Sequence, residues 1–539
     1  MIRFLKWQYL NLNIQNKTLH RMRSISASSV ILLVIPLVLS AFVHIWNPVG
    51  FPGIHGDEGH YIRRGIHTSD GLGPQEPTSN YDHPYFGWLS LAAIFSIIGY
   101  PDSLNAEAGD TNSIERVWAA PRLIVGLLAV VDTFLIYKIT ERKYNNKVAF
   151  IAAVLFAVMP LSWMLRRVLL ESILMPLILS SVLFALNIKA IPLGFVYKQN
   201  PLQQKQQPYL LSALLSGVFL GLAIFTKIPA ITFIPLVGYL VYSNSSRSFK
   251  SIAVFVVPVL LIPLLWPTYS IIANEYDKWL DGIEFQTTRA SKPLLDSIIS
   301  IFYTDPVITI LGIGGTIFAV VLKKDIFYLL WILPFLLFLY FIDYVSPFFL
   351  VLLLAPFCIA AAAMIEDLIR RFIQKRKRLA RIVPVVVMIV IGFFGMASTT
   401  PLILQNDNSD YFQVISAVSQ QLPANAGDNT GSSSANGDND KMTIIGSPSY
   451  YWILQYVFDK PDYNYKTQFN LISKNTVENI VEQSEKVILI ADRNIIDIVN
   501  NETAPDSAKA EQRADRLRQI YESTELLETV GRTQIRTNY

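Results

Sequence analysis

Long apolar blocks, separated by polar connections, constrain this 539-residue chain more than any other feature of its sequence. About 20 apolar residues in an α-helix are long enough to cross the hydrocarbon of a bilayer. About eleven blocks meet or approach that length, at residues 27–46, 117–139, 148–165, 169–189, 209–226, 228–243, 251–266, 306–322, 326–342, 344–365 and 382–400. Because backbone polar groups in lipid must be satisfied within the segment, we expect these blocks to be helices. The sequence therefore predicts a polytopic α-helical membrane protein.

The composition agrees with this class. Charged residues make up 16% of the chain, whereas a soluble domain carries roughly a quarter. The net charge of +4 is too small to suggest a nucleic-acid partner. The single cysteine, Cys358, lies inside an apolar block and forms neither an internal disulfide nor a Cys-rich metal site. Because no small-x-small cleavage site follows residues 27–46, we interpret this block as an uncleaved membrane anchor.

Basic residues are concentrated in alternate connections, which orients the chain. With the N-terminal segment 1–26 in the cytoplasm, the connections on the same side hold Arg142, Lys143, Lys147, Lys198, Lys205, Arg247, Lys250, Lys323, Lys324 and the run from Arg370 to Arg381. The first outer connection, residues 47–116, is instead acidic, with Asp57, Glu58, Asp70, Glu76, Asp82, Asp102, Glu107, Asp110 and Glu115. This is the pattern of the positive-inside rule. It predicts a multi-pass protein of the cell membrane with a cytoplasmic N-terminus and an extracytoplasmic C-terminal part.

Three predicted outer segments are long, at residues 47–116, 267–305 and 401–539. Within the first, the apolar stretch 84–100 is just short of a span and predicts a helix lying along the membrane surface. After the transmembrane module 27–400, strand-like runs at 442–446 and 486–491 and helix-like runs at 411–421 and 508–520 predict a small α/β domain. The polar segment 425–440 within it has the composition of a flexible loop.

An acidic pair, Asp57-Glu58, follows the first block on the outer side. Two carboxylates in this position are compatible with a general base, a metal site or ordinary solvated charge, and the residues alone leave these alternatives open. His83 stands at the start of the apolar stretch 84–100, where it would contact either an anionic head group or solvent.

Further ionisable residues lie at the outer ends of separate blocks: Arg122, Arg167, Glu171 and Lys227. Such groups near hydrocarbon are costly unless they are paired or bind a ligand. Arg167 and Glu171 are four residues apart and would pair on a continuous helix, while an arginine that snorkels to the interface is the alternative. Because Arg and Lys are phosphate-binding residues, a carboxylate base with a phosphate clamp at the outer face suggests group transfer from a lipid phosphate.

The order of these motifs resembles the GT-C glycosyltransferases. G-D-E-x-x-Y at 56–61 and H-P-Y-F-G-W-L at 83–89 are similar to the acidic pair and the (H/K)PP(L/F)G segment of that superfamily. The branch with this pattern holds dolichyl-phosphate-mannose–protein mannosyltransferases and lipid A aminoarabinose transferases. Residues 147–175 are similar to its third-and-fourth-helix signature and residues 214–237 to its G-x-x-x-G-L-x-x-x-x-K segment. The likeness covers roughly residues 30–365. It departs at Tyr85, where the family has a second proline, and the C-terminal domain does not resemble the β-trefoil module of eukaryotic protein mannosyltransferases.

The resemblance implies an inverting hexosyltransferase that moves a sugar, with mannose expected, from a polyprenyl- or dolichyl-phosphate donor to a hydroxyl acceptor at the outer membrane face. It implies that Asp57 deprotonates the acceptor hydroxyl and that Glu58 supports Asp57 or positions the acceptor. It further implies that His83, Arg167 and Lys227 bind the donor phosphate, with Glu171 at the second acidic position and Arg122 a further candidate from its location. A protein hydroxyl is the expected acceptor, and a lipid or glycan is the alternative.

Two further alternatives concern a metal and a different protein class. The lipid monophosphate leaving group already carries its charge near the interface, so no metal is required, but His55, Asp57, Glu58 and His60 are compatible with a divalent ion. A transporter or flippase of lipid-linked substrates would also contain many helices. Transporters usually contain internal repeats and charged sites near the bilayer midplane. The chain has no obvious repeat and its charges gather at one face, which favours the transferase.

Overall fold

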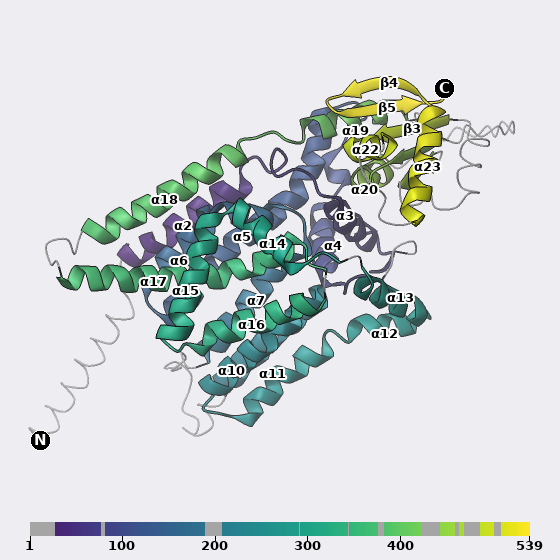
Figure 1. The fold of residues 1–539 in the computed structure, drawn as a ribbon. Coiled ribbons are helices and arrows are strands. Elements are labelled where there is room, and N and C mark those ends of the chain that lie inside the picture. Colours follow the sequence, from purple (N-terminus) through teal and green to yellow (C-terminus); the bar gives the residue numbers. More distant parts are fainter. Residues whose placement is uncertain are drawn as a thin grey trace, which may run out of the picture.

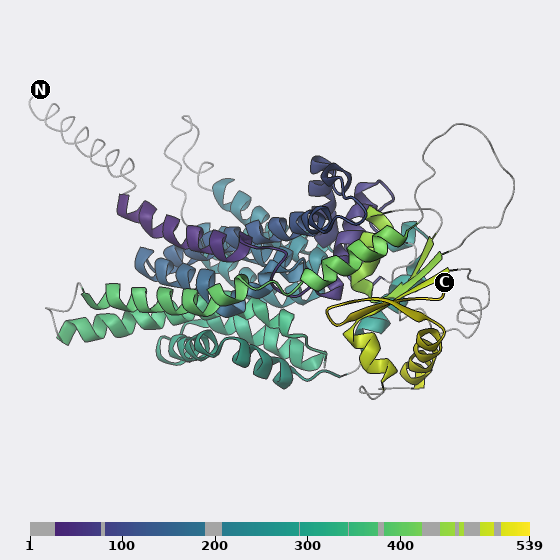
Figure 2. The same ribbon diagram turned by 90° about the horizontal axis from the view of Figure 1, so that it is seen from above.

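The structure is a computed structural model that describes residues 27–76, 81–188, 207–289, 291–342, 344–375, 382–422, 442–458, 463–467, 486–500 and 508–539. The expected N-terminal segment 1–26, the basic residues Lys198 and Lys205, residues 376–381 of the basic run and the expected loop 425–440 fall outside these ranges. The described residues form an elongated bundle of helices with a small α/β domain at one end (Figures 1 and 2). The two predicted parts of the chain are therefore present.

Each of the eleven apolar blocks contains a helix. These helices are α2 (Ala27–Ile45), α5 (Thr111–Lys143), α6 (Asn146–Val158), α7 (Leu170–Asn187), α9 (Gln207–Thr226), α10 (Ile234–Asn244), α11 (Phe249–Leu261), α15 (Pro306–Ile317), α16 (Ile326–Phe341), α17 (Leu354–Lys375) and α18 (Ile382–Ile403). Several of them are continued by short helical turns, including η2 (Pro160–Arg166), η3 (Ile228–Phe233), η4 (Phe318–Leu322), η5 (Pro347–Leu353) and α12 (Leu265–Ile272).

The expected number of spans is not confirmed. By length and composition, the described part of the chain has 6 helices that could cross a membrane, or up to 8 if each bent pair is one span, with four shorter apolar helices besides. One bent pair is α6 with η2, at 66°, and the other is α14 (Leu294–Thr304) with the segment Pro306–Leu322, at 116°. Proline begins the second member of both pairs, and because proline lacks an N–H group it starts a helix more readily than it continues one.

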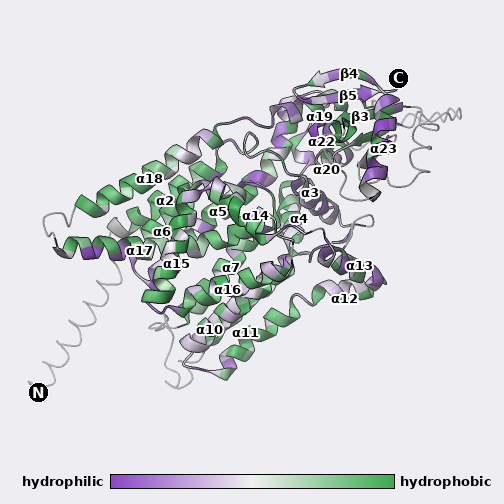
Figure 3. Cartoon of the chain, viewed as in Figure 1, coloured by the Kyte–Doolittle hydropathy of each residue, from purple (hydrophilic) through white to green (hydrophobic). Residues whose placement is uncertain are grey.

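The outer surface of the bundle is apolar. Figure 3 shows hydrophobic residues along the bundle and more hydrophilic residues in α3 (Gly56–Ser69), α13 (Tyr276–Thr287) and the C-terminal domain. On α18, Val385, Ile389 and Phe393 are 56%, 63% and 74% exposed. A soluble protein rarely exposes such a continuous apolar face, whereas lipid solvates it. The chain is accordingly a multi-pass membrane protein.

The C-terminal domain is a five-stranded mixed sheet with helices. Its strands are β1 (Met442–Gly446), β2 (Tyr463–Thr467), β3 (Lys486–Ala491), β4 (Glu525–Val530) and β5 (Thr533–Thr537), in the order β2-β1-β3-β5-β4. Strand β1 is parallel to both β2 and β3, while β5 is antiparallel to β3 and β4. The two predicted strands coincide with β1 and β3, whose paired Ile444 and Ile488 are both fully buried. The predicted helices correspond to α19 (Ser409–Gln421) and α23 (Ala508–Glu522), and α20 (Pro448–Trp452) and α22 (Arg493–Val499) follow β1 and β3.

The C-terminal domain packs directly on α3, the helix that begins with the acidic pair. A methyl group at Gly59 would lie 2.7 Å from the ring of Trp452, so only glycine allows this approach. Trp452 is fully buried and its ring lies 5.0 Å from that of Trp118 on α5. The hydroxyl of Tyr456 donates to Glu76 over 2.7 Å. These contacts hold the first outer segment and the C-terminal domain together as one extramembrane layer.

The first outer segment also contains the predicted surface helix. Residues Phe86–Ile98 form α4, which packs against α3, and Ile97 is 83% exposed. The second outer segment contributes α13, where Gly282 contacts the backbone of Tyr81 closely. The Tyr81 hydroxyl donates to Glu275 over 2.6 Å, so the two outer segments are joined beside α3.

Candidate active site

Asp57 lies in the first turn of α3, where its carboxylate lines a cavity and its Oδ2 is 3.8 Å from Nδ1 of His55. His55 is the N-cap of this helix, and its Nδ1 accepts from the backbone N–H of Asp57 over 3.3 Å. The Asp57 side chain is 56% exposed. It lines a cavity of about 580 Å³ together with the backbone of Gly53 and Gly56. A carboxylate at a helix N-terminus is stabilised by the helix dipole, and here it also faces open space, as a general base must.

Glu58, its neighbour, faces the protein interior. Its Oε1 accepts from Arg122 over 2.7 Å and from the N–H of His55 over 3.0 Å, and its Oε2 accepts from Arg122 over 3.0 Å and from the N–H of Val168 over 3.1 Å. Burial alone would raise the pKa of Glu58, but the charge and hydrogen bonds of Arg122 hold it below its usual value. Glu58 is fully buried. Of the two roles expected for Glu58, this geometry favours support of Asp57 over positioning of the acceptor, because the buried Glu58 holds the turn that carries Asp57.

Arg122 belongs to the same buried arrangement. Besides Glu58, its guanidinium donates to the backbone oxygens of Pro48 over 3.0 Å and Pro52 over 2.9 Å. The residue is 1% exposed. A phosphate has no access to this guanidinium, so the burial of Arg122 argues against the phosphate-binding role expected from its location. Its hydrogen bonds instead hold the chain before Asp57 in place.

Arg167 also holds the chain before Asp57. Its Nε and Nη2 donate to the carbonyl of Gly53 over 3.1 and 2.7 Å, and its Nε is 4.0 Å from Glu58 Oε1. The guanidinium lies over the ring of Phe348 at 5.2 Å. The expected pair with Glu171 is wrong, because Arg167 has extended backbone, with ψ 146°, and α7 begins only at Leu170.

Glu171 instead pairs with Lys227. Their Nζ and Oε1 atoms are 2.5 Å apart, and the side chains are only 7% and 6% exposed. Lys227 lies at the break between α9 and η3, with extended backbone, and its Nζ is 4.0 Å from the centre of the Phe349 ring. A break in a helix near the membrane surface leaves this lysine directed inward, where its charge requires a partner.

His83 lies beside this pair in a polar cluster. Its neighbour Asp82 forms an ion pair of 2.7 Å with Arg64. Burial, with the positive charges of Lys227 and Arg64, lowers the pKa of His83 to about 4 although Asp82 acts in the opposite direction. His83 is consequently neutral near pH 7 and is available as a hydrogen-bond donor rather than as a cation.

Tyr61 connects the carboxylate to the polar cluster. Its ring is 6.4 Å from that of His83. Burial and the negative charges of Asp57 and Glu171 raise the pKa of Tyr61 well above its usual value, so its phenol stays protonated. The structure thus gathers the expected residues at one end of the bundle. However, the wall of the cavity includes Asp57 and does not include Lys227 or Arg167.

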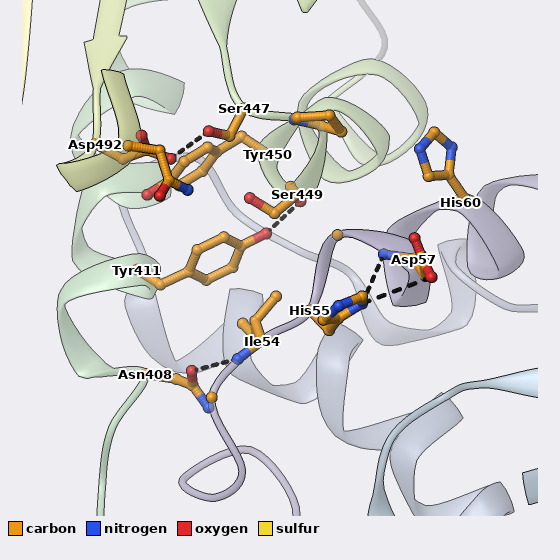
Figure 4. Close-up of a pocket in the computed structure, with 14 residues that line it drawn as sticks. Ile54, His55, Asp57, His60, Asn408, Tyr411, Ser447, Ser449, Tyr450 and Asp492 are labelled. Carbon is orange, nitrogen blue, oxygen red and sulfur yellow. Dashed lines mark hydrogen bonds and ion pairs between the residues drawn. The ribbon is translucent and has the colours of Figure 1, made fainter. Parts of the chain in front are cut away.

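The opposite wall of the cavity comes from the C-terminal domain, which sequence reasoning missed. This wall comprises Asn408, Tyr411, Ser447, Pro448, Ser449, Tyr450, Asp492 and Asn494. Figure 4 shows Asp57 and His60 on one side of the space and Ser447 and Asp492 on the other. Ser447 and Asp492 directly follow the parallel strands β1 and β3. Ligands in α/β sheets bind outside the carboxyl ends of such strands, so the two strand-like runs were the available signal.

The four residues weighed as metal ligands have different partners in the structure. Among the residues that the structure describes, no group of three or more His, Cys, Asp or Glu side chains is arranged to hold an ion. Of the four residues, Glu58 is occupied by Arg122 and by the backbone N–H groups of His55 and Val168, whereas Asp57 lines the cavity.

Comparison with known proteins identifies the fold. Residues 115–271 match the family described as dolichyl-phosphate-mannose-protein mannosyltransferase. No curated protein sequence matches the chain. The apo structure of ArnT from Cupriavidus metallidurans is similar with a TM-score of 0.56 at 11% identity, covering 96% of this chain and 99% of that chain. The same protein bound to undecaprenyl phosphate has a TM-score of 0.52 at 11% identity, with the same coverage.

A second similar structure is the archaeal oligosaccharyltransferase AglB from Archaeoglobus fulgidus, in complex with an inhibitory peptide and a dolichol-phosphate. Its TM-score is 0.54 at 12% identity, covering 94% of this chain and 74% of that chain. These likenesses extend over both the helical bundle and the C-terminal domain. The chain shares the fold of these GT-C glycosyltransferase structures, and its sequence likeness to the protein mannosyltransferase family is located in residues 115–271.

Proposed function

We propose that this protein is an inverting glycosyltransferase that moves a sugar from a polyprenyl- or dolichyl-phosphate donor to a hydroxyl acceptor at the outer membrane face. The observation that carries the proposal is the exposed carboxylate of Asp57 in a cavity, on a turn that the buried Glu58 and Arg167 hold in place. Undecaprenyl phosphate and dolichol-phosphate in the similar structures support the class of donor. Mannose is the expected sugar, from the matching family.

The chemistry assigned to Asp57 is a single displacement. The carboxylate takes the proton of the acceptor hydroxyl while the oxygen attacks the anomeric carbon and the bond from that carbon to the phosphate oxygen breaks. Attack opposite to the leaving group inverts the configuration. General-base assistance of this kind typically contributes about 10²–10⁴-fold to the rate. One exposed carboxylate suffices for it, which agrees with Asp57 exposed and Glu58 buried.

The leaving phosphate is assigned to the polar cluster below Asp57. Lys227 would contribute a charge that is already desolvated and therefore strong, and neutral His83 would donate a hydrogen bond. Arg167 would act on the same side, although in the present arrangement it donates to the backbone of Gly53. The role of Glu171 is to hold Lys227 in place before the donor arrives. We assign no resident metal to this step.

The orientation and the acceptor complete the proposal. We place the N-terminus in the cytoplasm and the C-terminal domain outside, because basic residues are concentrated in the connections on one side of the bundle and the first connection on the other side is acidic. A protein hydroxyl is the proposed acceptor. The peptide bound to AglB supports this choice, and a lipid or a glycan is the alternative.

Transfer by the purified protein tests the proposal. The full chain in lipid nanodiscs would receive radiolabelled polyprenyl-phosphate mannose and a pool of peptide, glycan and glycolipid acceptors. We expect wild-type transfer and a loss of at least about 100-fold in Asp57→Asn. Asp70→Asn, which removes an exposed carboxylate from the other end of α3, is the matched control and should be unchanged. Equal transfer by Asp57→Asn and wild type would exclude Asp57 as the base. Absence of transfer from any lipid-phosphate sugar would favour a transporter.

A further inference from the structure

The cavity beside Asp57 has the size of a small binding site. Its volume of about 580 Å³ lies within the range of sites for small molecules and a few residues of a peptide. One wall is the turn before α3, where a methyl group on Gly53 or Gly56 would meet no atom within 4 Å, so the backbone there is accessible. The other wall is the carboxyl edge of β1 and β3 (Figure 4).

The carboxylates that line this cavity have no basic side chain beside them in the lining. Its lining includes two carboxylates, Asp57 and Asp492, on opposite walls. Among the described residues that line it, none is lysine or arginine. The remaining polar side chains are hydroxyls, the two amides of Asn408 and Asn494 and two imidazoles, and the rings of Tyr411 and Tyr450 stack at 4.7 Å. Such a lining disfavours a phosphorylated or otherwise anionic acceptor, because a desolvated anion would lack a counter-charge.

The carboxylate of Asp492 is held by hydrogen bonds and can accept one more. Backbone N–H groups of Asn494 and Ile495 and the hydroxyl of Ser447 donate to its carboxylate. A carboxylate offers about four acceptor positions, so these three donors leave one position unfilled in a residue that lines the cavity. Asp492 is the N-cap of α22, and this role explains its hydrogen bonds to the backbone. The capping role does not explain why the Asp492 carboxylate also lines the cavity that contains Asp57.

We infer that this cavity binds the acceptor as a hydroxyl-bearing peptide with a basic side chain close to the modified residue, and that Asp492 is the residue that selects the basic group. The inference rests on the proposed function for the role of Asp57. It adds the chemical class of the acceptor. The accessible backbone of Gly53 and Gly56 suits an extended peptide, and its basic side chain would reach across the cavity to Asp492. The carboxyl edge of the C-terminal sheet thereby becomes a specificity determinant.

A binding experiment without donor tests this inference separately from transfer. The full chain in nanodiscs would be titrated with fluorescent peptides of one length, with a central threonine flanked by Lys, Gln or Glu, and binding would be followed by fluorescence anisotropy. We expect the Lys peptide to bind roughly tenfold more tightly than the Glu peptide, as a partly exposed charge-assisted contact provides. Asp492→Asn should reduce this ratio to about twofold, because asparagine keeps the helix cap but loses the charge.

The control variant is Asp497→Asn, which removes a carboxylate from the same helix outside the cavity, where Asp497 pairs with Arg493. It should preserve the tenfold ratio. Equal binding of the three peptides to the wild type, or an unchanged ratio in Asp492→Asn, would overturn the inference. If Asp492→Asn folds poorly, the comparison of the Lys, Gln and Glu peptides on the wild type still tests whether the cavity prefers a basic side chain. Displacement of the Lys peptide by a neutral oligosaccharide would assign the cavity to a glycan and also overturn it. Failure of the proposed function would appear differently, as charge-selective binding without any transfer.

Discussion

Replacement of Glu58 by glutamine should destabilise the fold, although it changes one atom. Both carboxylate oxygens of Glu58 accept two hydrogen bonds, and all four donors are N–H groups of Arg122, His55 and Val168. Whichever way the amide is turned, its NH₂ group would face two N–H donors. Arg122, which is 1% exposed, would also lose its counter-charge. Breaking a buried ion pair on one side costs about 3–5 kcal/mol, so we expect the free energy of unfolding of Glu58→Gln to fall by that amount.

The measurement is reversible unfolding of the purified protein in mixed micelles, with Glu107→Gln as the control. Glu107 has an exposed side chain in the same outer segment, and its replacement should change the free energy of unfolding by less than about 0.5 kcal/mol. Adding Arg122→Met to Glu58→Gln should restore only part of the loss, because the carbonyls of Pro48 and Pro52 then lose their donor. A Glu58→Gln protein as stable as the control would refute the assignment of Glu58 as the residue that holds this turn.

Three further outcomes are expected. Gly59→Ala should lower the free energy of unfolding by about 1–3 kcal/mol, since its methyl group would overlap the buried ring of Trp452, whereas Gly56→Ala meets open space and should be close to neutral in the same unfolding assay. Burial lowers the pKa of His83 from 6.5 to about 4, so the unfolded chain binds more protons between these values and stability should fall as the pH falls from 6.5 to 4. His83→Gln should make that pH dependence shallower, and an unchanged slope would contradict a buried neutral histidine. Transfer should persist after exhaustive treatment with a chelator, and recovery only on addition of a divalent ion would show that the step needs a metal.

Regular features of the fold were accessible from the sequence because they depend on local patterns. The apolar blocks are long relative to a bilayer, so their helices follow from backbone hydrogen bonding alone. The strands β1 and β3 are short apolar runs between polar segments and were predicted within their observed bounds. The number of spans was not predictable in the same way, because the bend before Pro160 interrupts a block that hydropathy reads as continuous and because α14, in a segment expected to be a loop, joins the block that begins at Pro306.

The partners of the charged residues depended on contacts that no local pattern contains. Spacing suggested that Arg167 would pair with Glu171, but the chain is extended between them and Glu171 pairs with Lys227, 56 residues away. Equally, Asp57 and Glu58 are adjacent, yet their first-turn positions on α3 direct one carboxylate into a cavity and the other into the protein.

The sequence by itself determined the membrane-spanning character of the chain, its charge asymmetry and the location of an acidic pair just after the first apolar block, since each follows from residue type along one segment. Only the tertiary structure decided that Asp57 is the exposed member of the pair and that Arg122 is a structural partner. It also decided that the C-terminal domain supplies the second wall of the cavity. The reason is physical: a buried charge is defined by the partner that compensates it, and that partner comes from a distant part of the chain.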